Sequence, residues 1–113
     1  MNNITKYVTQ PVNENDCLVG TYVGVQYDDA GYIGFIEDIS EEFGDYKVLF
    51  LKQEQQTTYK FTKEWCWMTP MDVLIILSPP EMICARPIKY KFLKKEIDSI
   101  NKMILSKKNT RKK

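Results

Sequence analysis

Residues that could carry acid–base or nucleophilic chemistry are scarce in this chain of 113 residues. It contains no histidine, and Cys17, Cys66 and Cys84 stand at unrelated spacings. Three such cysteines make neither a zinc site nor an even disulfide framework, and none has an activating neighbour in the sequence. Carboxylate pairs such as Glu41-Glu42 fall in segments expected to be exposed turns, where pKa values are not tuned. The sequence therefore predicts no catalytic residue, no metal and no cofactor.

The remaining candidates are side chains that bind rather than react. Tyr27 and Tyr32 flank an acidic turn, and Trp65 and Trp67 lie two residues apart. In an extended strand two such tryptophans point to the same side, whereas in a 3₁₀ turn they diverge. They are candidates for the hot spot of a protein interface. Alternatively, Trp67 caps the core beside Pro70 and Trp65 is partly exposed.

Charge divides sharply along the chain, although the net charge is only +1. Residues 1–85 carry five lysines against thirteen carboxylates, a net of −8, and residues 86–113 carry eleven basic residues against two carboxylates, a net of +9. The acidic residues gather in two expected turns and their flanks: Asp28, Asp29, Glu37, Asp38, Glu41, Glu42 and Asp45. They form either a solvated face or a surface that steers a basic peptide toward the chain.

Composition is typical of one globular domain with a modest core, with 43% hydrophobic and 12% aromatic residues. No apolar run approaches the roughly 20 residues of a membrane span. Residues 1–16 lack the basic start and apolar stretch of a secretory signal, and they predict a loose arm. Because the cysteines predict no disulfide framework, we expect a nuclear or cytoplasmic protein without membrane contact.

Alternating apolar residues separated by polar turns predict five short strands. In the first, Val23, Val25 and Tyr27 share one face. The following turn is expected to place Gly31 at positive φ, and Gly34 indicates a close backbone approach. An aromatic corner, either a 3₁₀ turn or bent extended chain, is expected at residues 64–70. The expected strands are 21–27, 32–39, 46–51, 59–62 and 72–77, which favour a small barrel over residues 17–80 rather than a sandwich.

The chain after Pro79-Pro80 is expected to be extended and then helical, with the helix over Lys91–Ser106. One apolar stripe runs along this helix at spacings of four, three and four: Leu93, Ile97, Ile100 and Ile104. The stripe could dock on the chain's own barrel, over Ile33, Phe35 and Leu49. Alternatively, it is a dimer or partner interface, which would make a weak homodimer of an otherwise monomeric chain. The basic tail, residues 107–113, is a candidate nucleic-acid contact.

The order of these features resembles the Tudor branch of the SH3-like barrels. The shared pattern consists of Gly20, a strand ending in Tyr27, the acidic turn Asp28-Asp29-Ala30-Gly31, the triplet Tyr32-Ile33-Gly34, and a strand ending in Phe50. A longer pattern adds Tyr59-Lys60-Phe61, Trp67, Pro70 and Asp72-Val73, and it resembles SH3-like modules of transposon-related and orphan animal proteins. The resemblance covers residues 18–80.

The resemblance implies a pocket for a methylated lysine or arginine, lined by Tyr27, Tyr32 and Phe50. Ring quadrupoles attract such a cation by about 0.5–2 kcal/mol per ring. A carboxylate of Asp28, Asp29 or Glu54 would add selectivity for charge. The chain departs from the family pattern at Leu51-Lys52-Gln53-Glu54, where the last wall usually stands, so Trp65 or Trp67 could supply that wall. Alternatively, the three rings only fill the end of a small core.

These patterns together predict a mostly β chain, a five-stranded SH3-like barrel of Tudor type with a C-terminal helix. We expect a non-catalytic module that binds a basic or methylated peptide, or a protein carrying one, in a chromatin-associated or cytosolic complex. The alternatives are nucleic-acid binding through the C-terminal helix and basic tail, and assembly through the apolar stripe.

Overall fold

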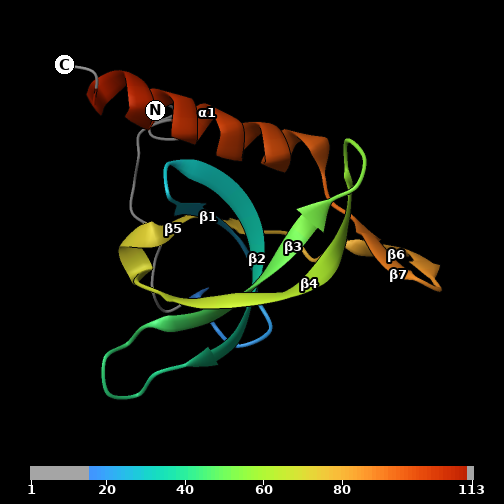
Figure 1. The fold of residues 1–113 in the computed structure, drawn as a ribbon, viewed down its shortest axis with the longest axis horizontal. Helices are drawn as coiled ribbons and strands as arrows, with labels where there is room; N and C mark the ends of the chain where they lie inside the picture. Colours follow the sequence, from blue (N-terminus) through green and yellow to red (C-terminus); the bar gives the residue numbers. More distant parts are fainter. Residues whose placement is uncertain (1–15, 112–113) are drawn as a thin grey trace, which may run out of the picture.

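The computed structural model describes residues 16–111, with side chains to residue 106. Within this range the chain forms seven strands and one long helix, and their arrangement is drawn in Figure 1. The strands are β1 (Tyr22–Tyr27), β2 (Ala30–Ile39), β3 (Tyr46–Gln53), β4 (Thr58–Met68), β5 (Val73–Leu77), β6 (Glu81–Ala85) and β7 (Ile88–Lys91). A single-turn 3₁₀ helix, Pro70–Asp72, connects β4 to β5, and α1 spans Lys94–Arg111.

The strands form one antiparallel sheet in the order β5-β1-β2-β3-β4-β7-β6. The sheet is strongly curled, so that β1 to β5 form a half-barrel with α1 lying across one end (Figure 1). The prediction of a mostly β chain with a C-terminal helix is confirmed. The prediction of five strands is wrong, because the described residues form seven.

The two additional strands, β6 and β7, form a hairpin that projects from the body of the sheet (Figure 1). β7 joins the sheet only at the start of β4, through Thr58 and Tyr59. The sequence predicted an extended segment here but no paired strands; prolines precede the hairpin at 79 and 80 and stand in its turn at 87. Met82, Ile83 and Ile88 are about half exposed. The chain stays extended to Lys91, and α1 begins at Lys94, three residues after the predicted start.

The inner face of the half-barrel is a continuous apolar core. Val23, Val25, Ile36 and Val48 are fully buried there. A Cβ atom at Gly34 would collide with the side chain of Val48, so the glycine allows β2 to pass closely over β3. This is the close backbone approach that the sequence predicted for Gly34.

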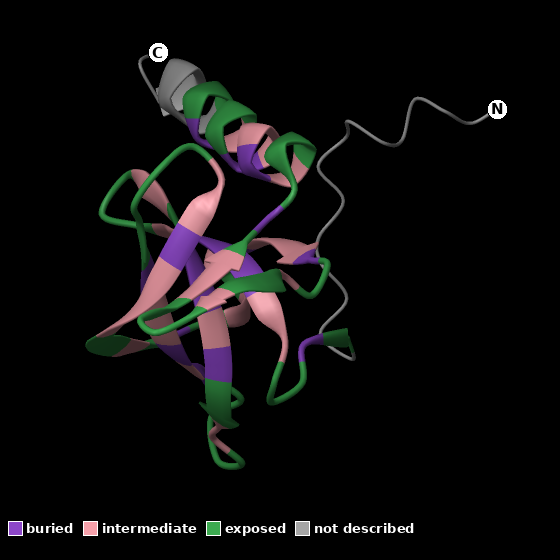
Figure 2. Ribbon diagram, turned by 90° about the vertical axis from the view of Figure 1, so that its right-hand side faces the viewer, coloured by how far each residue is buried: buried purple, intermediate pink, exposed green. Residues whose placement is uncertain are grey.

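The outer face of the same strands is apolar too, and α1 covers part of it. Ile97, Ile100 and Ile104 are buried (Figure 2), and a Cβ atom at Gly24 would lie 2.6 Å from Ile100. Ile33 belongs to the same buried cluster as Ile97 and Ile100. The stripe therefore docks on the chain's own sheet and does not form the exposed partner or dimer surface proposed as the alternative.

The stripe also begins differently from the prediction. Leu93 precedes α1 and is about half exposed, whereas its neighbour Phe92 is buried at 2% exposure. The backbone N–H of Phe92 donates to the carbonyl oxygen of Thr57 at 2.9 Å, which turns this ring inward at the end of β7. Leu93 is thus not part of the contact between α1 and the sheet. Leu49, which was predicted to lie beneath the stripe, is also not part of the buried cluster that contains Ile33, Ile97 and Ile100.

The turn between β1 and β2 is tighter than predicted. Tyr27 pairs with Ala30, so only Asp28 and Asp29 form the loop, at φ values of 55° and 68°. A two-residue hairpin loop with both central residues at positive φ matches the twist of the flanking strands, and aspartate is among the residues that tolerate this conformation. The prediction that Gly31 takes positive φ is wrong. Gly31 lies in β2, where a Cβ atom would approach Ile100 to 2.7 Å.

The expected aromatic corner is instead a continuation of β4. Trp65 and Trp67 are strand residues that pair with Leu49 and Lys47 of β3. The chain bends later, at the 3₁₀ turn, where the carboxylate of Asp72 accepts hydrogen bonds from the N–H and the hydroxyl of Thr69 at 3.0 and 3.1 Å. Of the two local structures expected for residues 64–70, the extended one is therefore found up to Met68.

Candidate functional site

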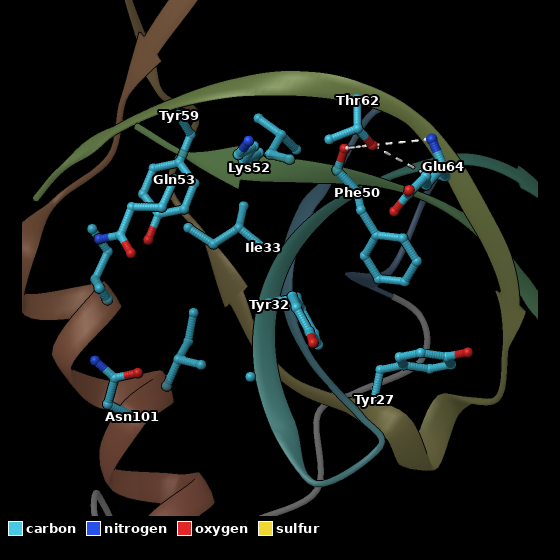
Figure 3. A pocket seen from close by; sticks show the side chains of 14 residues that line it. Tyr27, Tyr32, Ile33, Phe50, Lys52, Gln53, Tyr59, Thr62, Glu64 and Asn101 are labelled. Atoms are coloured by element: carbon cyan, nitrogen blue, oxygen red, sulfur yellow. Dashed lines mark hydrogen bonds between the residues drawn. The ribbon is translucent and has the colours of Figure 1, made fainter. Parts of the chain in front are cut away.

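A pocket of about 480 Å³ opens where the start of β2 and the end of β3 meet α1. Figure 3 shows that it has an aromatic end and a polar end, the latter beside the helix. Its wall is formed by residues of β1, β2, β3, β4 and α1: Tyr27, Gly31, Tyr32, Ile33, Phe50, Leu51, Lys52, Gln53, Tyr59, Thr62, Glu64, Ile97, Ile100 and Asn101.

Three rings, Tyr27, Tyr32 and Phe50, form the aromatic end of the pocket, and we call them the mouth rings. Their centroids are 6.3 Å apart for Tyr27 and Tyr32, 5.9 Å for Tyr27 and Phe50, and 5.8 Å for Tyr32 and Phe50. Tyr27 is 48% exposed and Tyr32 41% exposed. The family resemblance predicted that these three residues line one pocket, and in the structure they lie side by side at its aromatic end (Figure 3).

The strand register explains why the mouth rings meet. Tyr32 pairs with Val25, and Gly34 pairs with Phe50, so Tyr32 lies diagonally opposite Tyr27 on β1 and diagonally opposite Phe50 on β3. Diagonal neighbours on one face of an antiparallel sheet are within reach of aromatic side chains. The two-residue turn at Asp28 and Asp29 fixes this register.

A bulge in β4 supplies the carboxylate that lines the pocket. Leu49 pairs with Trp65 and Leu51 with Phe61, so three residues of β4, 62–64, stand opposite the single residue Phe50. The hydroxyl of Thr62 donates to the carbonyl oxygen of Phe50 at 2.8 Å and accepts from the N–H of Glu64 at 3.0 Å. Bulges re-aim side chains, and here Glu64 joins the wall of the pocket beside the mouth rings (Figure 3).

The polar end of the pocket is built from β3, β4 and α1. Gln53 and Asn101 present amide groups there, and Lys52 lies between this end and the mouth rings (Figure 3). Tyr59 lines the same end, and burial raises the pKa of its hydroxyl above the ordinary value. At neutral pH this hydroxyl is therefore an uncharged hydrogen-bonding group.

The carboxylates that the sequence assigned to the pocket lie elsewhere. Asp28 and Asp29 form the turn next to Tyr27 and are exposed, but they do not line the pocket. Glu54 pairs with Lys89 at 3.3 Å and with Lys60 at 3.6 Å. The hydrogen bond from Lys89 is the main reason that the pKa of Glu54 is lowered.

Neither tryptophan is a wall of the pocket. The wall includes no residue of β4 beyond Glu64, and the Trp65 ring lies instead under the ammonium group of Lys47, at 4.4 Å from Nζ to the ring centroid. The hypothesis that Trp65 or Trp67 completes the pocket is therefore corrected: Glu64 and Thr62 occupy that side. The polar triplet Thr62-Lys63-Glu64, which interrupts an aromatic strand, is the sequence signal that could have revealed the bulge.

The acidic residues do not form one surface. Asp28 and Asp29 stand at the start of β2, whereas Glu41, Glu42 and Asp45 stand beyond its other end. The ten-residue strand β2 separates the two groups. The chain therefore carries two distinct acidic regions, of which only the first adjoins the mouth rings.

Two segments with predicted roles fall wholly or partly outside the described residues. The loose arm predicted over residues 1–16 lies outside the described residues except for Asp16, and the side chains of the basic tail 107–113 lie outside them altogether.

Among residues 16–111, no helix is long and apolar enough to span a membrane. In that same range no group of histidine, cysteine, aspartate and glutamate side chains is arranged to hold a metal ion.

The fold and the pocket together define the class of this protein: a curled antiparallel half-barrel with a docked helix and an aromatic pocket at its mouth. No protein-family model, no curated protein and no solved structure matches the chain.

Proposed function

We propose that this chain is a non-catalytic recognition module, an SH3-like barrel of Tudor type, that binds a basic peptide or protein. The mouth rings take a methylated lysine or arginine side chain, and Glu64 faces its positive charge. The observation that carries the proposal is the meeting of Tyr27, Tyr32 and Phe50 at centroid distances of 5.8–6.3 Å in a pocket that also includes a carboxylate.

The geometry suits a cation of this size. A cation above the centre of a triangle with such sides lies within about 6 Å of all three centroids, the range over which a ring quadrupole attracts a positive charge. The N-methyl groups of a methylated side chain contact apolar ring surface, and ring faces are the surface that the mouth offers. Since Tyr27 and Tyr32 are nearly half exposed, their rings are accessible without a rearrangement of the core.

The proposal also requires a partner segment that carries net positive charge. The exposed carboxylates of Asp28 and Asp29 adjoin Tyr27 and attract a basic segment around the inserted side chain. Such steering acts mainly on the association rate and weakens as salt rises.

The direct test is a titration of the full chain with Nα-acetyl-lysine amides that carry zero to three ε-methyl groups and with the corresponding methylated arginine derivatives. Binding is followed through the backbone N–H signals of residues 27–34 and 50 by NMR. We expect saturable shifts with the methylated compounds, weaker shifts with the unmethylated ones, and none with the uncharged isostere Nα-acetyl-norleucine amide.

Variants assign the binding to the mouth rings. Tyr27→Ala and Tyr32→Ala should each weaken binding by about two- to thirtyfold, which corresponds to 0.5–2 kcal/mol per ring. Trp65→Ala is the matched control, because Trp65 is an equally exposed aromatic residue outside the pocket. If no methylated compound binds, or if both tyrosine variants bind as well as the natural chain, the proposal is wrong.

A further inference from the structure

The two tryptophans, which the pocket does not use, lie together on the face of the sheet opposite to the mouth rings. Trp65 pairs with Leu49 and Trp67 with Lys47, so both point to the face that bears Leu49 and Lys47, whereas Val48 between them points into the inner core. Trp65 is 50% exposed and Trp67 44% exposed. We call Trp65, Trp67 and Lys47 the tryptophan face.

This surface continues the covered outer face of the sheet beyond its cover. Leu49 pairs with Phe35 on one side and Trp65 on the other, and Phe35 packs against the cluster buried beneath α1. The cross-strand row Phe35–Leu49–Trp65 therefore begins at the covered aromatic residues and ends at an exposed indole. Two half-exposed tryptophans on adjacent positions of one face are unusual for a solvated surface, and tryptophan is the residue most enriched at interface hot spots.

The chain itself shows which chemistry this face accepts. Nζ of Lys47 lies 4.4 Å from the centroid of the Trp65 ring and 3.8 Å from Oε1 of Glu37. A cationic side chain is thus held between an indole face and a carboxylate. Trp67, the cross-strand partner of Lys47, is similarly exposed, and among the described residues no cation lies over its ring.

The surrounding charge is strongly negative. From residue 37 to residue 47 the chain carries five carboxylates (Glu37, Asp38, Glu41, Glu42 and Asp45) and one ammonium group, a net charge of −4. Asp38 pairs with Lys47, and Lys47 pairs with Trp67, so this acidic segment borders the tryptophan face directly. The complementary partner is therefore cationic and planar enough to stack on an indole, which describes a guanidinium better than an ammonium.

We propose that the tryptophan face is a second docking site, which binds an arginine-bearing segment of a partner protein independently of the mouth rings. A guanidinium stacks on Trp67 while its N–H groups reach the carboxylates of the bordering acidic segment. The site lies on the opposite face of the sheet from the mouth rings, so a segment bound at one site does not occupy the other.

The test uses the fact that the chain contains only these two tryptophans. Their two indole N–H signals in NMR, assigned with Trp65→Phe and Trp67→Phe, report on this face alone. Titration of the full chain with an acetylated, amidated hexa-arginine peptide should shift both signals to saturation, and a hexa-glutamate peptide should shift neither. The absence of indole shifts with hexa-arginine at millimolar concentration would overturn the proposal.

Matched variants separate stacking from simple charge attraction and from the function of the pocket. Trp67→Leu, which removes the indole but keeps an apolar side chain, should weaken hexa-arginine binding by about three- to thirtyfold. Tyr27→Ala should leave the indole shifts, and the affinity measured from those shifts, unchanged. Equal affinity in Trp67→Leu would show that charge alone accounts for binding, and loss of the indole shifts in Tyr27→Ala would show that the two faces are one site.

The chain's own basic tail is the competing occupant. A full-length variant in which Lys107, Lys108, Arg111, Lys112 and Lys113 are all changed to glutamine should keep the indole signals of the natural chain. If those signals move in the free variant, the tail occupies the face and the proposal of a partner segment is wrong.

Discussion

Two aromatic clusters in this protein have similar ring-to-ring geometry and opposite exposure. In the covered cluster (Tyr22, Phe35, Phe61, Tyr90 and Phe92) neighbouring ring centroids are 4.9–6.4 Å apart, and among the mouth rings they are 5.8–6.3 Å apart. In the covered cluster Phe92 is buried and the other four residues are partly buried against the core that includes Ile97 and Ile100, whereas Tyr27 and Tyr32 are exposed at the pocket. Contact between rings therefore does not distinguish a core from a binding site; what covers the rings does.

The ionisation behaviour of the tyrosines agrees with this difference in cover. The pKa of Tyr22 is raised, chiefly because burial disfavours the phenolate and secondarily because Tyr90 lies nearby. Burial alone raises the pKa of Tyr59, whose ring meets Phe92 at 5.3 Å. Both of these tyrosine rings contact the buried ring of Phe92.

The largest expected effect comes from removing one ring of each cluster. Phe92→Ala should destabilise the fold by about 3–5 kcal/mol, because the ring is buried and its loss leaves a cavity. Tyr27→Ala should cost less than about 1 kcal/mol, because the ring is nearly half exposed. Urea unfolding of both variants measures the difference. Similar losses of stability in the two would contradict the distinction between the clusters.

A smaller effect tests how closely the cover fits. Gly24→Ala should destabilise the fold by about 1–3 kcal/mol, since the new Cβ atom would lie 2.6 Å from Ile100 and 2.9 Å from Ile75. In a double-mutant cycle the loss caused by Gly24→Ala should shrink in an Ile100→Ala background, because the obstructing atoms are gone. Strictly additive losses would mean that α1 does not rest on Gly24.

The covered face could be predicted from sequence, because its pattern is local. The spacing of Ile97, Ile100 and Ile104 requires one apolar stripe, and strands that are apolar on both faces require a cover. The same local logic placed Tyr27, Tyr32 and Phe50 at strand ends. What it could not supply was the role of Gly31, which depends on a helix about 70 residues later in the chain.

The parts that sequence did not reveal depend on contacts between distant segments. Glu64 enters the pocket because Thr62 bonds to the backbone of Phe50, twelve residues away. The segment after Pro79-Pro80 was predicted to be extended, but its pairing as the β6–β7 hairpin and the contact of β7 with the start of β4 were not, because they depend on distant residues. Glu54 was placed at the pocket because it follows β3 directly, yet its two lysine partners hold it elsewhere.

The smallest effect concerns Glu54, which belongs to the cover rather than to the pocket. Its carboxylate joins the turn between β3 and β4 to Lys89 of β7, and the hydrogen bond from Lys89 is the main cause of its lowered pKa. A carboxyl group with a lowered pKa stabilises the fold above the pKa of the unfolded chain, and this contribution is lost as the pH falls through the lowered value.

Lys89→Met should therefore raise the pKa of Glu54 toward its ordinary value, and the matched variant Lys60→Met should raise it less, because Lys60 is farther, at 3.6 Å against 3.3 Å. Carboxyl ¹³C NMR titration of Glu54 in the natural chain and in both variants measures the three values. An unchanged pKa in Lys89→Met, or a larger rise in Lys60→Met, would show that Glu54 does not fasten β7 to the sheet. Glu54 would then not be held away from the mouth rings by Lys89, and this ion pair would not separate the covered aromatic residues from the open ones.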